Sequence, residues 1–292
     1  MNNWIQRTFL LLAVLLIDFG QAYSQIKQLG TLEAHRYIYG ETGAPYKNLY
    51  VYLPEDYYTS DKHYPVVYLL HGANGNERSW VDKGSILGQI DSLTQSKVLK
   101  ESIYVFPNMN RYYRYYDSFT SRPKGSIESF LDLNGSSEFS FIEDIMTFVD
   151  RTFRTIPCMK HRAIAGLSLG GLQSLYITAN TTDSFGYIGL FSPIIYPPLT
   201  FGELSHIYRN LEQKLNSQSD AEPMLYLIMI GEDDPYFEAA YIYSQLLEKL
   251  QFKHIFIKTP GGHTWENWCE YCTIFLKSLW KESPQGLNNT IS

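Results

Sequence analysis

Residues 166–171 read Gly-Leu-Ser-Leu-Gly-Gly, and this stretch decides the fold. It follows a short, mainly apolar run at 162–165 that is typical of a buried strand, and it precedes a run at 172–177 that is typical of the start of a helix. A strand, a Gly-x-Ser-x-Gly turn and a helix form the setting of a nucleophile elbow. We therefore expect Ser168 in a tight, strained turn at the carboxyl edge of a sheet, with a helix amino terminus behind it that favours negative charge.

Strands and helices are predicted to alternate along the rest of the chain. Apolar runs rich in β-forming residues predict strands, and apolar residues at helical spacing predict helices. The predicted strands lie at 34–39, 49–53, 64–70, 103–106, 162–165, 187–191, 224–230 and 253–258. Helices are predicted at 86–99, 139–153, 203–215, 235–250 and 265–280. This order predicts an α/β fold whose mainly parallel central sheet is covered by helices on both faces, as a three-layer sandwich.

The segment 1–24 has the pattern of a secretory signal peptide. Arg7 precedes a nearly continuous apolar run at 8–17, and the small residues Ala22 and Ser24 favour cleavage after Ser24. The run is about half of the roughly 20 residues that a membrane span needs. No cysteine follows the run as a site for bacterial lipid attachment. We therefore expect an exported protein, secreted or periplasmic, with no stable membrane anchor.

Residues 25–282 are long enough for one large α/β domain, and a flexible polar tail is expected at 283–292. The net charge of −6 comes without a basic stripe, which argues against a nucleic-acid partner. The 24 tyrosines fit either a surface that stacks on flat or sugar-like ligands or ordinary amphipathic packing. The sequence does not indicate an oligomeric state.

The three cysteines, Cys158, Cys269 and Cys272, are too few for a disulfide framework. Cys269 and Cys272 lie in a predicted helix, and no further cysteine or histidine pair completes a zinc site. We therefore expect ordinary packing and no metal. A local disulfide between Cys269 and Cys272 is the alternative in an oxidising compartment.

The chain offers a base and an acid for Ser168. A serine hydroxyl needs a base that takes its proton and an acid that orients the base, and in a fold with this elbow they follow in the order Ser, Asp or Glu, His. His263 fits the base because it follows the last predicted strand, and two preceding glycines allow the turn. Glu232, Asp233 and Asp234 all follow the strand before it and compete for the role of the acid.

Backbone N–H groups are expected to bind the negative oxygen of a tetrahedral intermediate. One belongs to Leu169, the residue after the candidate nucleophile. The second is expected from Ala73 in the glycine-rich segment 71–75, which follows a predicted central strand. His71 lies in the same segment, and we interpret it as structural.

Four landmarks stand in order along the chain. They are His71-Gly72 with Trp80 downstream, the elbow at 166–171, Gly231-x-x-Asp234, and Gly261-Gly262-His263 followed by Trp265 and Trp268. In these landmarks the chain resembles the esterase D and feruloyl esterase superfamily, carbohydrate esterase family one in particular. The resemblance implies an α/β-hydrolase fold and a serine hydrolase that needs no metal or organic cofactor. It also selects Asp234 as the acid, three residues after the glycine, and Ala73 as the donor, directly after the first glycine of its loop.

Members of that superfamily remove ferulate or acetate from plant xylan, hydrolyse small acyl or siderophore esters, or transfer acyl groups between sugars. The resemblance therefore implies an exported serine carboxylesterase that acts on feruloyl- or acetyl-type esters attached to carbohydrate. Three alternatives are acyl transfer to a sugar, a siderophore or small-acyl esterase, and a carbohydrate-binding protein on a disabled hydrolase scaffold.

Aromatic side chains are expected to line the substrate pocket. The segment 108–135 is longer than the corresponding loop of the family and carries a run of tyrosines, and loops of this length are usually functional or mobile. The candidates for substrate binding are Tyr112, Tyr113, Tyr115, Tyr116 and Trp265.

Overall fold

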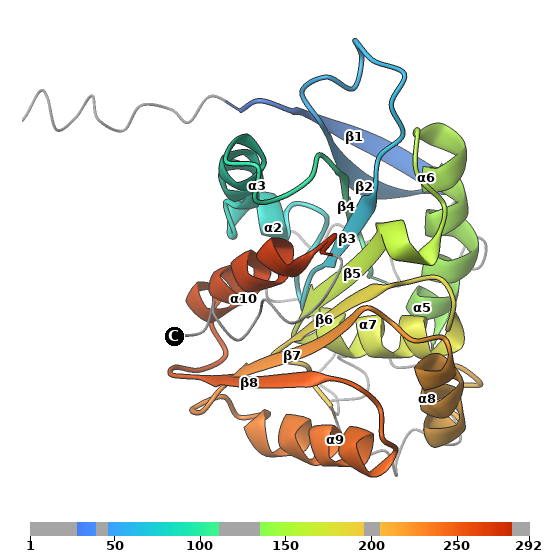
Figure 1. Ribbon diagram of the computed structural model, residues 1–292, viewed down its shortest axis with the longest axis vertical. Helices are drawn as coiled ribbons and strands as arrows, with labels where there is room; N and C mark the ends of the chain where they lie inside the picture. Colours follow the sequence, from blue (N-terminus) through green and yellow to red (C-terminus); the bar gives the residue numbers. More distant parts are fainter. Residues whose placement is uncertain (1–27, 39–45, 111–134, 196–204, 282–292) are drawn as a thin grey trace, which may run out of the picture.

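The computed structural model describes residues 28–38, 46–110, 135–195 and 205–281. The expected signal peptide, the tyrosine run of the long loop and the polar tail lie outside the described residues. Figure 1 shows the described residues as one twisted sheet with helices packed around it.

The described strands form an eight-stranded sheet in the order β1-β2-β4-β3-β5-β6-β7-β8. β2 runs antiparallel to β1 and to β4, and every other neighbouring pair is parallel. The strands are β1 (Thr31–Ile38), β2 (Tyr46–Leu53), β3 (Val66–Leu70), β4 (Ile103–Pro107), β5 (Arg162–Leu167), β6 (Tyr187–Phe191), β7 (Leu225–Gly231) and β8 (Ile255–Thr259). The prediction of a mainly parallel sheet is confirmed.

β3 and β5 lie at the centre of the sheet, and every residue of both strands is buried. Val67 of β3 pairs with Tyr104 of β4 and with Ala163 of β5, so this part of the sheet is hydrogen-bonded on both sides. Strands covered on both faces are continuously apolar because neither side chain direction reaches water. β1 at the edge is mostly exposed or half-buried, as expected for a strand with one neighbour.

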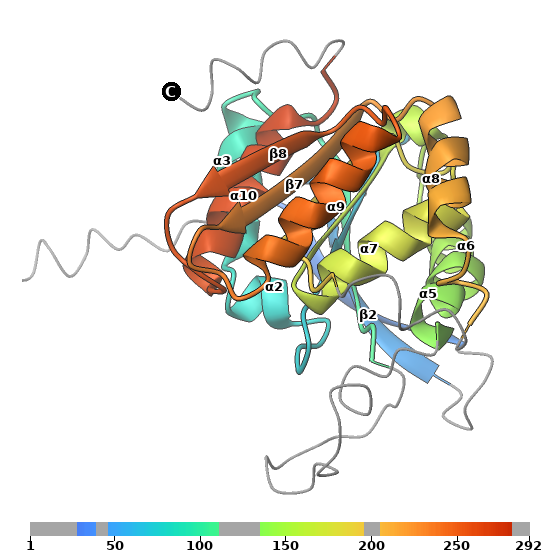
Figure 2. The same cartoon turned by 90° about the horizontal axis from the view of Figure 1, so that it is seen from below.

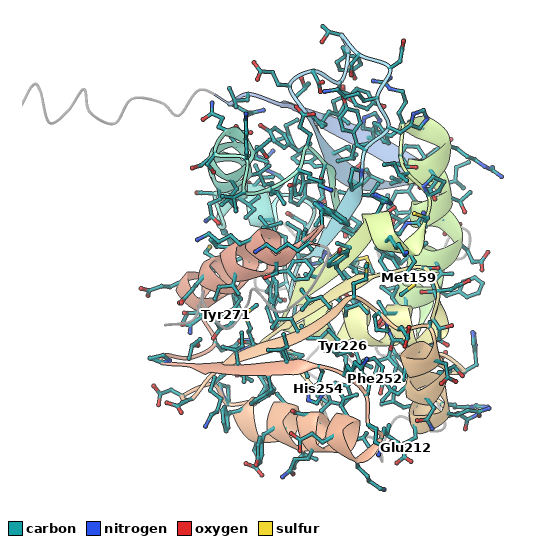
Figure 3. All side chains as sticks on the ribbon, viewed as in Figure 1. Met159, Glu212, Tyr226, Phe252, His254 and Tyr271 are labelled. Carbon is teal, nitrogen blue, oxygen red and sulfur yellow. The ribbon has the colours of Figure 1, made fainter. Side chains whose placement is uncertain are left out.

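Helices cover both faces of the sheet, as Figures 1 and 2 show. One face carries α2 (Ser79–Asp82), α3 (Ile86–Gln95) and α10 (Trp265–Ser278). The other carries α5 (Ser136–Ser140), a π-helical turn at Phe141–Ile145, α6 (Met146–Thr152), α7 (Leu169–Asn180), α8 (Leu211–Asp220) and α9 (Phe237–Lys249). Figure 3 labels Tyr271 on the α10 side of the sheet and Tyr226 and Phe252 on the α9 side. Tyr271 belongs to the hydrophobic core of the first face, and Tyr226 and Phe252 belong to that of the second. The predicted three-layer sandwich is confirmed.

The predicted helix at 203–215 is wrong in its bounds. Residues 206–210 form turns, and α8 begins at Leu211. Asn210 precedes it with a φ of 56°, a left-handed conformation that a continuous helix does not allow. Tyr208 is buried, with its ring 4.7 Å from that of Tyr176 on α7, so packing on α7 directs this segment.

Two other predicted helices differ at one end by more than two residues. α3 stops at Gln95 instead of residue 99, because Lys97 takes a φ of 58° and lets Leu99 turn back into the core. The helix predicted from residue 139 begins at Ser136 and contains the π-helical turn, which hydrophobic spacing alone does not reveal.

The loops after β3, β5, β7 and β8 lie at the carboxyl edge of the parallel strands, where open α/β sheets build their ligand sites. Two of these loops approach closely enough to require a glycine. A Cβ on Gly231, at the end of β7, would lie 2.1 Å from the carbonyl oxygen of Gly261, which follows β8. The sheet thereby brings the loops that carry the candidate acid and the candidate base together.

Candidate active site

Ser168 lies in a strained turn between β5 and α7. Its φ and ψ of 56° and −117° are a conformation that non-glycine residues rarely adopt, and its N–H donates to the carbonyl oxygen of Phe191, 2.8 Å away. A Cβ on Gly166 would lie 2.2 Å from the carbonyl oxygen of Gly170, and a Cβ on Gly170 would lie 2.6 Å from that of His71. Both glycines are therefore needed to let the strand, the turn and the helix meet.

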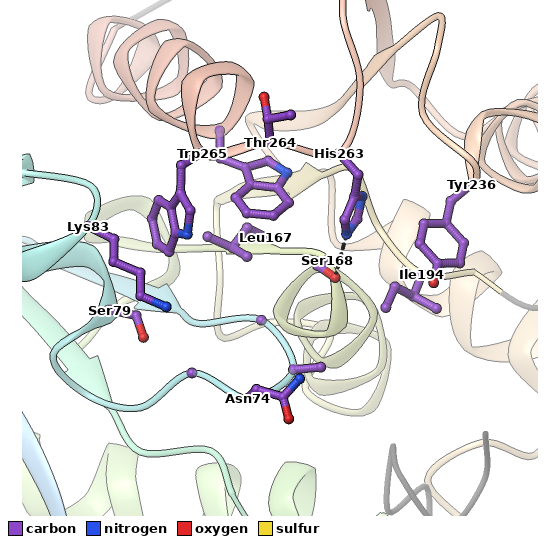
Figure 4. Close-up of a pocket in the computed structure, with 14 residues that line it drawn as sticks. Asn74, Ser79, Lys83, Leu167, Ser168, Ile194, Tyr236, His263, Thr264 and Trp265 are labelled. Atoms are coloured by element: carbon purple, nitrogen blue, oxygen red, sulfur yellow. Dashed lines mark hydrogen bonds between the residues drawn. The ribbon is translucent and has the colours of Figure 1, made fainter. Parts of the chain in front are cut away.

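The structure brings Ser168, His263 and Asp234 together in one hydrogen-bonded row, which we call the Ser–His–Asp relay. His263 Nε2 lies 2.8 Å from Ser168 Oγ, drawn as a dashed line in Figure 4, and His263 Nδ1 lies 2.9 Å from Asp234 Oδ2. A carboxylate only accepts hydrogen bonds, so Nδ1 carries the proton and donates it to Asp234. Nε2 of the neutral imidazole is then the acceptor for the Ser168 hydroxyl.

Asp234 is the one carboxylate of its loop that reaches the imidazole. Its side chain is fully buried, and its second oxygen, Oδ1, accepts the N–H of Tyr236 at 2.9 Å. Glu232 is exposed, with a carboxylate oxygen 3.9 Å from Lys258 Nζ, and Asp233 is exposed as well. A buried carboxylate with both oxygens occupied is held in one orientation, as the orienting partner of a base must be.

Aromatic rings fix the position of the His263 side chain. The ring of Tyr236 lies 5.1 Å from the imidazole on one side, and that of Trp268 lies 4.9 Å from it, almost perpendicular. The backbone before it is fixed by Asn267, whose amide Nδ2 donates to the carbonyl oxygen of Pro260 at 2.8 Å. The imidazole therefore has little freedom to leave the serine.

The loop after β3 lies directly against the serine. A Cβ on Gly72 would lie 3.2 Å from Ser168 Cβ, and the neighbouring residue Ala73 lines the same cavity as Ser168. Leu169 is the first residue of α7, so its N–H has no carbonyl partner one turn earlier in the helix. Both predicted donors therefore belong to segments that adjoin Ser168, and their role as oxyanion donors stays a prediction.

His71 holds this loop and does not belong to the relay. Its Nδ1 donates to the carbonyl oxygen of Gly72 at 2.7 Å, and its Nε2 accepts the N–H of Met109 at 2.9 Å. Burial lowers the pKa of His71 to about 4, so the ring is neutral at neutral pH. Its two backbone partners tie the loop after β3 to the end of β4.

A second brace of this loop was not expected from the sequence. The buried carboxylate of Glu77 accepts from Asn108 Nδ2 at 2.8 Å and from Asn48 Nδ2 at 3.3 Å. Asn110 Nδ2 donates to the carbonyl oxygen of Gly75 at 2.8 Å. The only signal in the sequence was the pair Asn108 and Asn110 after β4, and asparagines in a loop are compatible with many structures.

A cavity of about 550 Å³ opens beside Ser168. Its described lining consists of Gly72, Ala73, Asn74, Gly75, Ser79, Lys83, Leu167, Ser168, Ile194, Tyr236, His263, Thr264, Trp265 and Trp268. Trp265 lines this cavity, with its ring 5.5 Å from that of Trp80, and its role in substrate binding stays a prediction. Tyr236, Ile194, Asn74, Ser79 and Lys83 were not predicted as lining residues. Tyr112, Tyr113, Tyr115 and Tyr116 lie outside the described residues.

Within the described residues, no group of three or more histidine, cysteine, aspartate or glutamate side chains is placed to hold a metal ion. Cys158, Cys269 and Cys272 are free thiols, so the alternative of a local disulfide does not hold in this structure. None of the helices in the described ranges is long and apolar enough to cross a membrane.

The fold and the site define a class. A serine on a strained strand-to-helix turn, a histidine after the last strand and an aspartate after the strand before it are the arrangement of an α/β-hydrolase. Residues 46–273 match the model of the esterase family described as "Putative esterase", and the chain belongs to this family. The predicted superfamily is confirmed.

Individual proteins are similar to parts of the chain. The "Endo-1,4-beta-xylanase/feruloyl esterase" of Xylanibacter ruminicola is 33% identical over 154 residues, which are 51% of this chain and 20% of that protein. The chain thus corresponds to a minor part of this relative's length. The CE1 ferulic acid esterase of Anaeromyces mucronatus is 26% identical, with a TM-score of 0.70 over 86% of this chain and 90% of that one. An S-formylglutathione hydrolase of Staphylococcus aureus, 18% identical, has the same fold, with a TM-score of 0.63 over 90% of this chain and 98% of that one.

Proposed function

We propose that the protein is an exported serine carboxylesterase that hydrolyses feruloyl- or acetyl-type esters attached to carbohydrate. The observation that carries the proposal is the Ser–His–Asp relay, whose two hydrogen bonds measure 2.8 and 2.9 Å and whose serine faces a cavity. The names of the Xylanibacter ruminicola relative and of the Anaeromyces mucronatus structure support the choice of ester.

In the proposed reaction, Ser168 Oγ attacks the carbonyl carbon of the ester while His263 Nε2 takes its proton. Asp234 keeps the imidazole in the required tautomer and stabilises the imidazolium that forms. The N–H groups of Ala73 and Leu169 bind the developing oxyanion. His263 then gives the proton to the leaving alcohol, an acyl-enzyme remains, and a water activated by the same imidazole releases the acid.

The size and lining of the cavity suit a ligand with one flat or sugar-like part. Its volume of about 550 Å³ lies within the range of small-molecule sites. Trp265 and Trp268 form one wall, with their rings 5.4 Å apart and nearly perpendicular to each other. Aromatic walls of this kind suit the ring of a phenolic acyl group or the face of a sugar, because both bury apolar area against the indole.

A comparison of ester substrates tests this function. The purified mature protein is assayed with feruloylated arabinoxylan, acetyl-xylan and p-nitrophenyl acetate, beside the Ser168→Ala variant. We expect release of ferulate or acetate by the wild type and a loss of about 10⁴-fold or more in the variant, since the nucleophile is gone. Retained turnover by Ser168→Ala rejects the mechanism. Turnover of p-nitrophenyl acetate without release from either polysaccharide rejects the carbohydrate-linked substrate.

A further inference from the structure

Lys83 brings a positive charge to the cavity beside Ser168. Among the described lining residues it is the one lysine, and these residues include no arginine, aspartate or glutamate. Figure 4 draws Lys83 and Ser79 among the side chains that line the cavity, on the same side of the picture as Trp265. Lys83 and Ser79 line the same cavity as the predicted donor Ala73.

No acid neutralises this ammonium within the described part of the chain. The carboxylate next in sequence, Asp82, is held by Arg78, with Nε–Oδ2 and Nη2–Oδ1 distances of 2.7 and 3.1 Å. Glu77 is buried and accepts from Asn108 and Asn48. A lysine that lines a cavity without an ion pair presents its charge to whatever enters that cavity.

Ser79 adds a hydrogen-bond donor next to that charge. It is 5% exposed and lines the cavity, and its Oγ accepts the N–H of Asn76 at 2.9 Å. A hydroxyl that already accepts still has its proton to donate, and the described residues offer that proton no acceptor. An ammonium and a hydroxyl on one wall are a pair of donors that suits a carboxylate.

The backbone of Lys83 is held in place, so the side chain that carries the charge starts from a fixed position. Lys83 follows α2, and its N–H donates to the carbonyl oxygen of Ser79 at 3.0 Å. A Cβ on Gly84 would lie 2.7 Å from the carbonyl oxygen of Trp80 and 3.2 Å from the ring of Trp265. This close packing holds the segment against α10 at the rim of the cavity.

We propose that Lys83 and Ser79 form a carboxylate-recognition point, and that the preferred esters of this enzyme carry a free carboxylate in addition to the ester that is cleaved. The inference rests on the proposed function and narrows its substrate class. The carboxylate has two possible sources: a uronic acid on the alcohol side of the ester, or the second acid group of a dicarboxylic acyl group.

Two substrate pairs test the inference and separate the sources. On the alcohol side, ferulate esterified to glucuronic acid is compared with ferulate esterified to glucose. On the acyl side, the p-nitrophenyl half-ester of adipic acid is compared with p-nitrophenyl hexanoate. The readout is the ratio of kcat/KM for the charged ester to kcat/KM for its neutral partner, because a loss of active enzyme lowers both values alike.

We expect Lys83→Met to lower this ratio by about fivefold in one of the two pairs, because Lys83 is exposed and an exposed ion pair contributes at most about that factor. The pair that responds identifies the side of the ester that carries the carboxylate. Lys83→Arg, which keeps the charge, is expected to restore most of the ratio, and raised NaCl is expected to lower the wild-type ratio toward that of Lys83→Met. Lys253→Met, which removes an exposed lysine before β8, is the matched control and leaves both ratios unchanged.

The outcomes separate the inference from the proposed function. If the wild type cleaves the neutral esters and Lys83→Met changes neither ratio, the carboxylate-recognition point is wrong and the esterase stands. If Lys83→Met and Lys253→Met lower a ratio equally, the effect belongs to the net charge of the protein, and the inference is again wrong. If the wild type cleaves none of the four esters, the proposed function fails and the inference falls with it.

Discussion

At the scale of single residues, one imidazole connects the whole site. His263 has a carboxylate at one nitrogen and a hydroxyl at the other, and the rings of Tyr236 and Trp268 hold it between them. The acid fixes which nitrogen is protonated, so the chemistry of the base depends on a residue that never contacts the substrate. Two substitutions test this scale. One, at Asp234, tests the orientation of the imidazole through turnover, and the other, at His71, tests the pH dependence of the free energy of unfolding.

The first prediction concerns Asp234. Asp234→Asn replaces an acceptor with an amide that can donate to His263 Nδ1, and this turns the imidazole into the wrong tautomer. We expect kcat/KM to fall by about 10³–10⁴-fold with little change in the free energy of unfolding. Ester turnover and urea unfolding measure the two quantities. Asp233→Asn, an exposed neighbour, is expected to keep wild-type turnover, and an equal loss in both variants would show that the loop and not the carboxylate is responsible.

The second prediction concerns His71. Burial lowers the pKa of this ring to about 4 in the folded protein, against about 6.5 in an unfolded chain. Between these values the unfolded state binds a proton that the folded state does not, so the stability is complete above pH 6.5 and is lost as the pH falls toward 4. The loss amounts to up to about 3 kcal/mol for this group.

Urea unfolding of the wild type and of His71→Gln at pH 7 and pH 4.5 measures this loss of stability at low pH. The glutamine keeps a donor and an acceptor but does not titrate in this range. We expect the difference in the free energy of unfolding between the two pH values to be smaller in His71→Gln by about 2–3 kcal/mol. An identical difference in the two proteins would show that the ring is already protonated or accessible in the folded state.

At the scale of elements, the turns between strands and helices determine where the side chains go. The elbow works because β5, α7 and the end of β3 meet at two glycines, while His263 depends on the turn after β8 and on the start of α10. Each of these turns joins a strand to a helix within a few residues. The space around the glycines differs, so the effect of an added methyl group on stability differs from one glycine to the next.

The third prediction compares two glycines. Gly166→Ala places a Cβ 2.2 Å from a backbone oxygen that cannot move without the helix, and we expect a loss of about 3 kcal/mol or more in the free energy of unfolding. At Gly262 the nearest atom to an added Cβ is 3.4 Å away, so Gly262→Ala is expected to change stability by less than about 1 kcal/mol. Thermal or urea unfolding compares them. Equal stabilities would contradict the packing of the elbow.

At the scale of the whole molecule, two hydrophobic cores hold the sheet rigid while its carboxyl edge stays open to ligands. The helices α3 and α10 cover one face, and α7 and α9 are among those that cover the other (Figure 2). Every member of the Ser–His–Asp relay follows a strand of this sheet, so the relative positions of the three depend on the fold and not on flexible side chains.

The fourth prediction also concerns the whole chain. The leader pattern at 1–24 is expected to direct export and to be removed, which leaves Gln25 as the first residue of the mature protein. Expression of the full chain in a secreting bacterial host, with fractionation and amino-terminal sequencing, measures this. Recovery of the uncleaved chain from the cytoplasm would reject the exported protein.

Much of the fold and part of the site could be predicted from the sequence. The strands were visible because strands buried on both faces are continuously apolar, and the elbow was visible because its glycines are required by backbone contacts. The choice of Asp234 over Asp233 came from the resemblance to a family, since spacing alone leaves three carboxylates. Lys83, Ser79 and Tyr236 were missed because they lie at the ends of α2 and α9, and which helix ends line a cavity depends on the folded arrangement, which a linear pattern does not encode. The start of α8 was predicted at residue 203 for the same reason, because the packing of Tyr208 on Tyr176, which the linear pattern does not encode, determines where this helix begins.

The most direct test of the account is the mass of the enzyme during turnover. The protein is mixed with excess p-nitrophenyl acetate, quenched in acid within the first turnovers, and examined by intact-protein and peptide mass spectrometry. We predict one added acetyl group, located on Ser168, in the wild type and none in Ser168→Ala. An acetyl group on another residue at equal yield, or steady turnover with no acylated serine even at the earliest times, would contradict the assignment of Ser168 as the nucleophile.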